Sequence, residues 1–514
     1  MSRETWGKTE IGEVSGFANL NPKEATQTVK NRKQNSVKTP AAQARGEKAR
    51  EPNEINGSTH YDFNGKNLTP YGGLLPVITM LEKLGFQALV EELITLKRQT
   101  RAMAASKFLL TIVMGIYVGF GRLNQLRFIA KDPLLTGILQ VEAIPPQSTL
   151  WRFLASLHLT VSRQLLTLQG RLRERAWAAA HVQLKSITID TDTTVHTLYG
   201  KQMGARKSYN PKNKGKKSYQ PILTFLAETR EFLAGQLRNG DRPTGKQIAD
   251  HLAEVFRALP DLRTTAARFA RADSGFYCWE AIEAYLRWKC RFVVVARKTA
   301  RLLEQLRQAD WEPSPMTDAD AQCEFRYQPE GWKGEFRFVA LRYDHPEEPD
   351  EEQPVEQYQL FAVGRVKYRV FVTSIEDQPI DWVTWFYNGR AGAENLIKEA
   401  NNDAGLAAHP SKRFDTNAIH FQLAMLAYNL NCWLMLFQRK EDETVETLQH
   451  TTLATARLRF LFVAAKIWKH AGRTGISYSD QYQEQGLFNR LMTRLRNIVL
   501  PGEGFTPVMR VALE

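Results

Sequence analysis

Residues 184–192 (LKSITIDTD) mark the point at which the periodicity of the chain changes from helical to strand-like. Before them, apolar residues recur at three- and four-residue steps, whereas from Leu184 they alternate with polar ones, as in a half-buried strand. Further strand-like segments follow at 218–227 (SYQPILTFLA), 232–239 (FLAGQLRN), 265–273 (TAARFARAD) and 291–297 (RFVVVAR). An apolar helical stripe separates the third from the fourth. This part of the chain therefore predicts a mixed α/β domain.

The order of these segments favours an RNase H-like fold, in which three hairpin-linked strands are followed by alternating helices and strands. We expect the first part of this core at 181–299 and the second at 382–440. Strand-like segments between them predict a β-rich insertion at 300–381, which includes the acidic loop Asp344–Gln357. The fold class is thus α/β, with an RNase H-like catalytic core interrupted by a β-rich insertion and flanked by helical N-terminal and C-terminal regions.

The flanking regions differ in composition. Residues 1–60 are rich in Lys, Asn, Gln, Thr and Pro and contain few large apolar side chains, so we expect a disordered basic tail. Residues 61–180 show helical periodicity and predict a helical N-terminal domain. Residues 441–514 are expected to form a helical C-terminal region, with basic helices at 455–470 (TARLRFLFVAAKIWKH) and 488–497 (FNRLMTRLRN).

Composition limits the possible partners. A chain of 514 residues with 43% hydrophobic residues is neither disordered nor fibrous as a whole. The 69 basic against 55 acidic side chains leave a net charge of +14, which indicates a polyanionic partner. The longest apolar run, 108–120, is shorter than the about 20 residues of a membrane span, and the N-terminus lacks a signal-peptide core. We therefore expect a cytoplasmic protein with no membrane partner.

Candidate metal ligands are carboxylates. The 4 cysteines form no CxxC pair and the 10 histidines are scattered along the chain. Asp192 and Asp273 each end a predicted strand, and Glu394 lies in a predicted helix. Strand ends are where α/β folds usually place their sites, and three carboxylates in a basic chain predict an all-oxygen site for Mg²⁺ or Mn²⁺. Two such metals about 4 Å apart can drive an in-line attack on a phosphodiester. Singly, each acid is as readily a turn cap or a surface ion pair.

A basic loop follows the first candidate aspartate. The stretch 193–227 contains no acid and interleaves aromatic and amide side chains with cations. Its seven bases are Lys201, Arg206, Lys207, Lys212, Lys214, Lys216 and Lys217. This loop is a candidate to hold a nucleic-acid backbone beside the metals, although a solvated basic loop has the same composition.

Several blocks of the chain resemble the DDE transposases of bacterial insertion sequences, in the group with a Tyr-Arg-Glu-Lys signature, and are most similar to insertion sequence family 1380. The blocks are 119–133 (GFGRLNQLRFIAKDP), 145–154 (PPQSTLWRFL), 189–212 (IDTDTTVHTLYGKQMGARKSYNPK), 270–276 (ARADSGF) and 387–430, which begins YNGRAGAENLIKEANND. The resemblance covers most of the chain from about Tyr61.

The resemblance implies catalytic and metal-binding roles for Asp192, Asp273 and Glu394, with Mg²⁺ or Mn²⁺ as the cofactor. It implies cleavage at transposon ends and strand transfer into target DNA, with the helical N-terminal domain at 61–180 as a DNA-binding domain. The partners implied are double-stranded DNA, as terminal inverted repeats and target, and a second copy of the chain in a homodimer. The location implied is the bacterial cytoplasm at the nucleoid.

Two positions are left open within the resemblance. Tyr387 and Arg390 fit the signature up to Glu394, but the position expected to hold lysine is Asn401, so Lys398, one turn earlier, is the alternative basic contact to DNA. In the first block, Asp190 and Asp192 share one strand face. Asp192 is favoured because it directly precedes Thr193 and Thr194.

Two other functions compete with this interpretation. The stretch DTDTT also matches the opening of haloacid dehalogenase-like phosphatases, with Asp190 as the nucleophile and Asp192 as the general acid. That function leaves the basic loop and the net charge without a role. The second alternative is a catalytically inactive regulator that binds terminal repeats.

Overall fold

The computed structural model describes residues 55–96, 103–208, 210–211, 213–259, 267–316, 318–344, 366–440, 443–445 and 448–499. The chain divides into two units, Met1–Asn64 and Gly65–Glu514, and every described helix and strand belongs to the second. The tail predicted at 1–60 lies outside the described residues except for 55–60, which are exposed. Most of the acidic loop Asp344–Gln357 also lies outside them.

The second unit begins with a helical layer, as the periodicity of residues 61–180 predicts. Its helices are α2 (Leu74–Lys83), α3 (Phe86–Leu93), α4 (Ala105–Tyr117), α5 (Pro133–Leu139), α6 (Gln147–Ser156) and α7 (Thr160–Ala179). Nearly every residue of α4 is buried, because its apolar side chains surround the helix instead of forming one stripe. None of the described helices combines the length and the apolar character needed to cross a membrane.

A nine-stranded sheet forms the second layer, in the order β10-β11-β12-β13-β9-β8-β2-β6-β7. Five of its strands match the segments that begin at residue 184. They are β2 (Ser186–Thr193), β6 (Ile222–Leu226), β7 (Phe232–Gln236), β8 (Ala267–Ala272) and β9 (Arg291–Val295). Strands β2, β6 and β7 pair antiparallel, whereas β8 and β9 run parallel to β2 on its other side. Helices α8 (Gly245–Ala258) and α9 (Trp279–Arg287) make the connections that the parallel pairs require.

The block expected to be β-rich at 300–381 continues the same sheet. After α10 (Ala300–Gln308) it contributes β10 (Glu312–Pro313), β11 (Ala321–Tyr327), β12 (Phe336–Tyr343) and β13 (Lys367–Thr373). These four strands pair antiparallel, and β13 pairs antiparallel with β9. The strands expected in this block are therefore present, and they lengthen one sheet.

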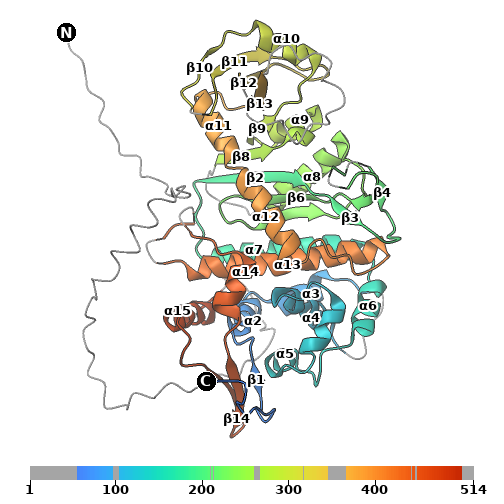
Figure 1. Cartoon of the computed structure of the whole chain (residues 1–514), viewed down its shortest axis with the longest axis vertical. Helices are drawn as coiled ribbons and strands as arrows, with labels where there is room; N and C mark the ends of the chain where they lie inside the picture. Colours follow the sequence, from blue (N-terminus) through green and yellow to red (C-terminus); the bar gives the residue numbers. More distant parts are fainter. Residues whose placement is uncertain are drawn as a thin grey trace, which may run out of the picture. The chain divides into compact units, whose positions relative to one another are not determined.

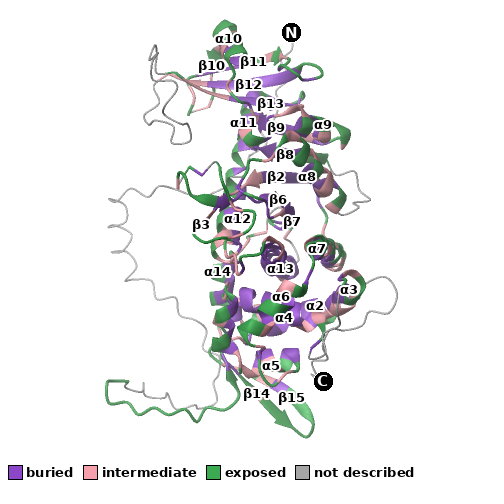
Figure 2. Ribbon diagram, turned by 90° about the vertical axis from the view of Figure 1, so that its right-hand side faces the viewer, coloured by how far each residue is buried: buried purple, intermediate pink, exposed green. Residues whose placement is uncertain are grey.

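Helices then return. They are α11 (Ile380–Asn388), α12 (Ala391–Asn402), α13 (Phe414–Gln438), α14 (Leu453–Ala456), a π-helical turn (Arg457–Leu461) and α15 (Gln485–Arg496). Helix α13 is buried along almost its whole length and packs on α4 and α7. Figures 1 and 2 show it lying between the sheet and the helical layer. The main apolar core therefore runs from the sheet through α13 into the N-terminal helices.

The expectation of a helical C-terminal region is wrong at residues 465–478. Strands β14 (Ala465–His470) and β15 (Arg473–Tyr478) form a hairpin there, and β14 also pairs with β1 (Leu68–Thr69). The two turn residues have positive φ angles, 49° at Ala471 and 80° at Gly472, as in the turn that suits the twist of a two-residue hairpin. Lys466 and Lys469 thus lie on a strand.

Candidate active site

Asp192 and Asp273 lie at the same edge of the nine-stranded sheet. Strands β2 and β8 run parallel, with Thr191 opposite Ala272, so the next residue of each strand is one of the two aspartates. Asp273 directly follows β8, and its carboxylate accepts a hydrogen bond of 2.9 Å from the backbone N–H of Gly275. The carboxyl ends of adjacent parallel strands therefore present two carboxylates side by side.

Glu394 reaches this edge from α12, which contacts β2. Arg390, at the start of α12, links the two elements through its guanidinium group. Its Nη2 lies 2.7 Å from Oδ2 of Asp192, and its Nη1 lies 3.1 Å from Oε1 of Glu394. The Arg390 side chain is 7% exposed, whereas that of Glu394 is 63% exposed. One buried cation therefore joins the strand carboxylate to the helix carboxylate.

Electrostatics confirm that these groups share one environment. Burial raises the pKa of Asp192 to about 7, with Arg390 opposing the rise and the negative charges of Asp273 and Glu394 adding to it. The pKa of Arg390 is raised by Asp192, Tyr387, Asp273 and Glu394, against the effect of its burial. The site concentrates negative charge around one cation, which is a setting that favours binding of further positive charge.

The donor set suits a hard divalent cation in kind. All three candidate ligands are carboxylates, the oxygen donors that Mg²⁺ and Mn²⁺ prefer. In the described part of the chain, however, no group of three or more His, Cys, Asp or Glu side chains converges tightly enough to hold a metal ion. Oxygens of Asp192 and Glu394 bind Arg390 instead, so metal binding by these residues stays a prediction.

Asp190 has a different environment from Asp192. Its carboxylate is 2% exposed and receives two hydrogen bonds of 2.7 Å from Arg271, while Nη1 of Arg271 donates to the carbonyl of Phe386 at 2.8 Å. Gly389 leaves room for this arginine, since a Cβ there would lie 2.3 Å from Nη1. Asp190 therefore fixes Arg271 of β8, which in turn binds the end of α11. A nucleophilic role for it, as a phosphatase requires, finds no support in this geometry.

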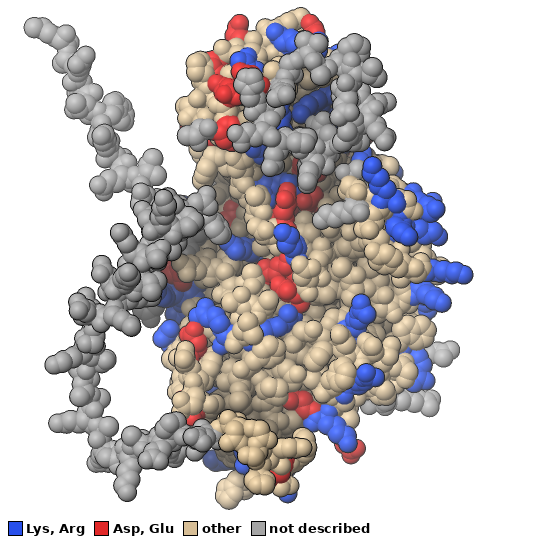
Figure 3. All heavy atoms as spheres, in the orientation of Figure 1, with Lys and Arg blue, Asp and Glu red and all other residues tan. Residues whose placement is uncertain are grey.

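The three signature residues differ in exposure. Tyr387 is buried against Phe371, with ring centroids 4.8 Å apart, and burial raises its pKa to about 12. Arg390 is also buried, whereas Lys398 is exposed on α12. Figure 3 shows acidic and basic side chains alternating along the face of α12. Of these three predicted DNA contacts, Lys398 alone is exposed to solvent.

A histidine cluster adjoins the site and was not anticipated from the sequence, which shows its histidines far apart. Nε2 of His196 lies 2.8 Å from Oδ1 of Asn401, and its Nδ1 lies 3.1 Å from Nε2 of His409. Nδ2 of Asn401 also contacts the hydroxyl of Thr194, two residues beyond Asp192. Asn401, at the position of the signature lysine, thus joins α12 to the chain just after β2.

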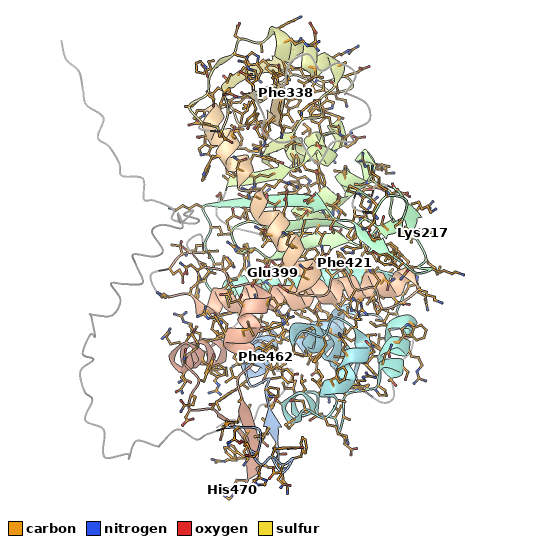
Figure 4. All side chains as sticks on the ribbon, in the orientation of Figure 1. Lys217, Phe338, Glu399, Phe421, Phe462 and His470 are labelled. Atoms are coloured by element: carbon orange, nitrogen blue, oxygen red, sulfur yellow. The ribbon has the colours of Figure 1, made fainter. Side chains whose placement is uncertain are left out.

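The basic loop after Asp192 folds into a small sheet of β3 (His196–Leu198), β5 (Lys217–Tyr219) and β4 (Arg206–Lys207). Figure 3 shows its cations gathered at one edge of the molecule, and Figure 4 shows Lys217 pointing away from the body. The exposed members are Lys201, Arg206, Lys207, Lys214, Lys216 and Lys217, and Lys212 lies outside the described residues. Arg206 also pairs with Asp241 at 3.2 Å.

Comparison with known proteins identifies a family and similar solved structures. The family model described as transposase DDE domain group 1 matches residues 53–500. A piggyBac transposase, solved by cryo-electron microscopy as a synaptic complex with hairpin DNA, is similar at 11% sequence identity and a TM-score of 0.41. The alignment covers 84% of this chain and 87% of that one. No curated protein sequence matches the chain.

Proposed function

Since the chain belongs to the family of transposases with a DDE domain of group 1, we propose that Asp192, Asp273 and Glu394 are its catalytic residues. The observation that carries this proposal is the pairing of Asp192 and Asp273 at adjacent parallel strand ends, with Glu394 tied to Asp192 through Arg390. Asp192 and Glu394, which are far apart in the sequence, both bind Arg390, and this arrangement supports the proposal.

The catalytic core is proposed to be RNase H-like. Support comes from the strand order β7-β6-β2-β8-β9, with three antiparallel strands followed by two that run parallel to the first. Strands β10 to β13, which extend this sheet beyond β9, correspond to the proposed β-rich insertion. The DNA-binding role of the helical N-terminal layer is part of the same proposal.

The reaction is proposed to be cleavage at transposon ends followed by strand transfer. Asp192, Asp273 and Glu394 would hold Mg²⁺ or Mn²⁺, which when bound activates the attacking water or 3′-hydroxyl and stabilises the leaving oxygen. The chain itself positions the phosphodiester. With metals bound, the carboxylate oxygens that pair with Arg390 would serve as ligands, and the Arg390 guanidinium and the Lys398 ammonium would contact phosphate oxygens.

The partner is proposed to be double-stranded DNA, as terminal inverted repeats and as target. The small sheet begins with β3 at His196, three residues after β2 ends at Thr193, and its exposed cations follow from Lys201 onward, so we expect DNA bound there to lie beside the carboxylates. Holding two ends requires at least a homodimer in the DNA complex. The blocks similar to insertion sequence family 1380 support an element of bacterial origin, which acts in the cytoplasm at the nucleoid.

The test is a cleavage assay with the purified full chain, Mg²⁺ and end-labelled duplexes taken from the DNA that flanks the reading frame. We expect nicking at a fixed position, and its loss by at least a hundredfold in Asp192→Asn, Asp273→Asn and Glu394→Gln. Glu283→Gln, which removes an exposed acid from α9, is the matched control and should cleave normally. Binding of the duplex without nicking by the wild-type chain would instead favour the inactive regulator.

A further inference from the structure

The β14–β15 hairpin, residues 465–478, is a second exposed basic feature, far from the candidate active site. Figures 1 and 2 show it projecting from the helical layer, on the side away from the nine-stranded sheet. Figure 4 shows His470 at its tip, pointing outward. Lys466, Lys469, His470 and Arg473 are all exposed.

The charge of this hairpin is of one sign. Residues 460–479 include no Asp or Glu. Among the ion pairs of the described residues, none involves Lys466, Lys469 or Arg473. Glu142 lines a groove between α5 and the hairpin, which Trp468 and Lys469 also line. The outer side therefore presents cations that no carboxylate of the described chain neutralises.

The hairpin has an anchored inner face and a free outer face. Ile467 and Ile476 face each other in the register and pack against the main core. On the opposite face lie Lys466, Trp468, His470 and Arg473. The Trp468 indole covers Gly475, where a Cβ would lie 2.1 Å from a ring carbon, and it stays 42% exposed. Because Gly475 has no side chain, the Trp468 indole can lie across it. The outer face is therefore flat, with cations at its margins.

The base of the ribbon is fixed to the body. Strand β1 pairs with β14 at Lys466 and Ala465, and the hydroxyl of Tyr478 donates to the carbonyl of Gly72 at 3.1 Å. The Tyr478 ring also packs edge-on against Phe488 of α15. A rigid base with a free basic tip is suited to insertion into a partner, because little conformational entropy is lost on binding.

We propose that the β14–β15 hairpin enters the major groove of duplex DNA, as a second contact remote from the scissile phosphodiester. The inference rests on the proposed transposase function and deepens it. A major groove about 12 Å wide admits a two-stranded ribbon. Strands of six residues span about 20 Å at the usual rise, enough to cross the groove between its phosphate walls. Lys466 and Arg473 on the outer face, and Lys469 beside His470 at the tip, then contact phosphates, and Trp468 faces the base edges.

The test compares full-length wild type with the triple variant Lys466→Ala, Lys469→Ala, Arg473→Ala. Binding of a fluorescein-labelled duplex from the DNA flanking the gene is measured by anisotropy as a function of salt. We expect the variant to bind at least tenfold more weakly, with a log–log salt slope smaller by about 2 to 3, since each lost phosphate contact removes about 0.9. Methylation of guanine N7, a major-groove atom, should be protected by wild type and not by the variant.

The matched control removes the same charge elsewhere. Arg301→Ala, Arg307→Ala and Lys333→Ala together delete three exposed cations from the block at 300–335 and should leave affinity and N7 protection unchanged. Circular dichroism checks that both variants are folded. Equal affinity and equal salt slope for the hairpin variant and wild type would overturn the proposal. So would a change in oligomeric state, seen by light scattering without DNA, with N7 protection retained, because the hairpin would then join two copies of the chain.

The experiments can distinguish an error in the hairpin contact from an error in the catalytic assignment. If the hairpin variant binds DNA normally while Asp192→Asn loses cleavage, the groove contact is wrong and the catalytic site stands. If wild type binds with N7 protection but nicks no duplex, the hairpin contact stands and the proposed cleavage is wrong.

Discussion

Asp190 and Asp192 lie two residues apart on one face of β2, yet their partners predict opposite effects of substitution. Asp190→Asn removes the charge that neutralises the buried Arg271 guanidinium, so we expect the free energy of unfolding to fall by about 3 kcal/mol. Asp192→Asn removes a carboxylate whose pKa is already raised to about 7, and should leave stability within about 1 kcal/mol while abolishing cleavage. Urea denaturation and the nicking assay separate the two effects.

An exposed aspartate provides the control for this comparison. Asp241→Asn breaks a surface pair with Arg206 and should change neither stability nor cleavage by a measurable amount. If Asp190→Asn is as stable as Asp241→Asn, the Arg271 pair does not hold β8 to α11.

The sequence predicts that a metal-binding aspartate lies in this strand and favours Asp192 over Asp190 only by its place before Thr193 and Thr194. The difference comes from Arg271, 81 residues away, which reaches Asp190 only because β2 and β8 pair in one register. A shift of that register would give Arg271 another partner. Residue types near the strand end therefore predict a site, and long-range pairing determines the environment of each acid.

Asn401 occupies the position of the signature lysine and contacts His196. Its Oδ1 lies 2.8 Å from Nε2 of His196, and a lysine in its place has no acceptor and brings a cation against a buried imidazole. We expect Asn401→Lys, which restores the signature residue type, to lower the free energy of unfolding by about 1 to 2 kcal/mol. DNA affinity should not rise, as anisotropy with the flanking duplex can show.

Lys398→Ala is the companion variant. Because Lys398 is exposed on the same helix, its removal should weaken DNA binding and leave stability unchanged. If Asn401→Lys binds DNA more tightly and Lys398→Ala binds it as well as wild type does, position 401 and not Lys398 is the site of the basic contact to DNA.

At the scale of elements, one buried carboxylate joins the helical layer to the sheet. Glu231, in the turn before β7, is 0% exposed and binds side chains from α7 and α13. Its oxygens accept from Nε of Arg173, Nε1 of Trp177 and Nε1 of Trp433, each at 2.7 Å. Glu231→Gln leaves Arg173 buried without its counter-charge, so we expect a loss of about 3 to 5 kcal/mol.

The measurement is urea denaturation followed by the fluorescence of the 11 tryptophans, which include Trp177 and Trp433. The control is Glu174→Gln. Glu174 lies on the surface of α7 and pairs with Arg171, so its substitution should lower the free energy of unfolding by less than about 1 kcal/mol. A similar small cost for Glu231→Gln would mean that the packing of α13, and not this polar network, joins the layers.

Local pattern predicts most elements but fails for the hairpin at 465–478. Its apolar residues also fit a short helical stripe, and a segment of six residues carries too little periodicity to separate the two. Arg457, expected on an exposed basic helix, is buried and donates to the carbonyls of Tyr117 and Asp403. These partners lie far away in the sequence, so its role depends on the tertiary structure.

At the scale of the whole molecule, the order of strands was predictable where neighbours in sequence are neighbours in the sheet. Strands β2, β6 and β7 are of this kind, and the parallel addition of β8 and β9 follows from their helical connections. The junction of β13 with β9 is different. It pairs Phe371 with Val295, which are far apart in the sequence. The alternation of polar and apolar residues within each strand does not predict which strands pair.

Acid sensitivity is a property of the whole fold, because buried histidines are spread over several elements. Burial lowers the pKa of His196 and His420 from 6.5 to about 4. Burial also lowers the pKa of His251 and His409 to about 3. The positive charge of Arg238 lowers the pKa of His251 further, and the imidazoles of His196 and His420 lower that of His409. Above pH 6.5 these groups are neutral in both the folded and the unfolded chain, so they do not affect the pH dependence. Below pH 6.5, these histidines bind protons in the unfolded chain but stay neutral in the folded chain, so the free energy of unfolding decreases.

We therefore expect the free energy of unfolding to decrease as the pH is lowered from 6.5 towards 4, by up to about 1.4 kcal/mol per pH unit for each such histidine. His251→Gln tests one contribution, since Nε2 of His251 lies 2.8 Å from the hydroxyl of Thr224 and glutamine can replace that hydrogen bond. Urea denaturation at pH 7.5, 6, 5 and 4 should show a shallower decline for the variant than for wild type. Parallel declines would mean that His251 becomes protonated in the folded chain at an ordinary pKa, through a local opening that lets water reach it.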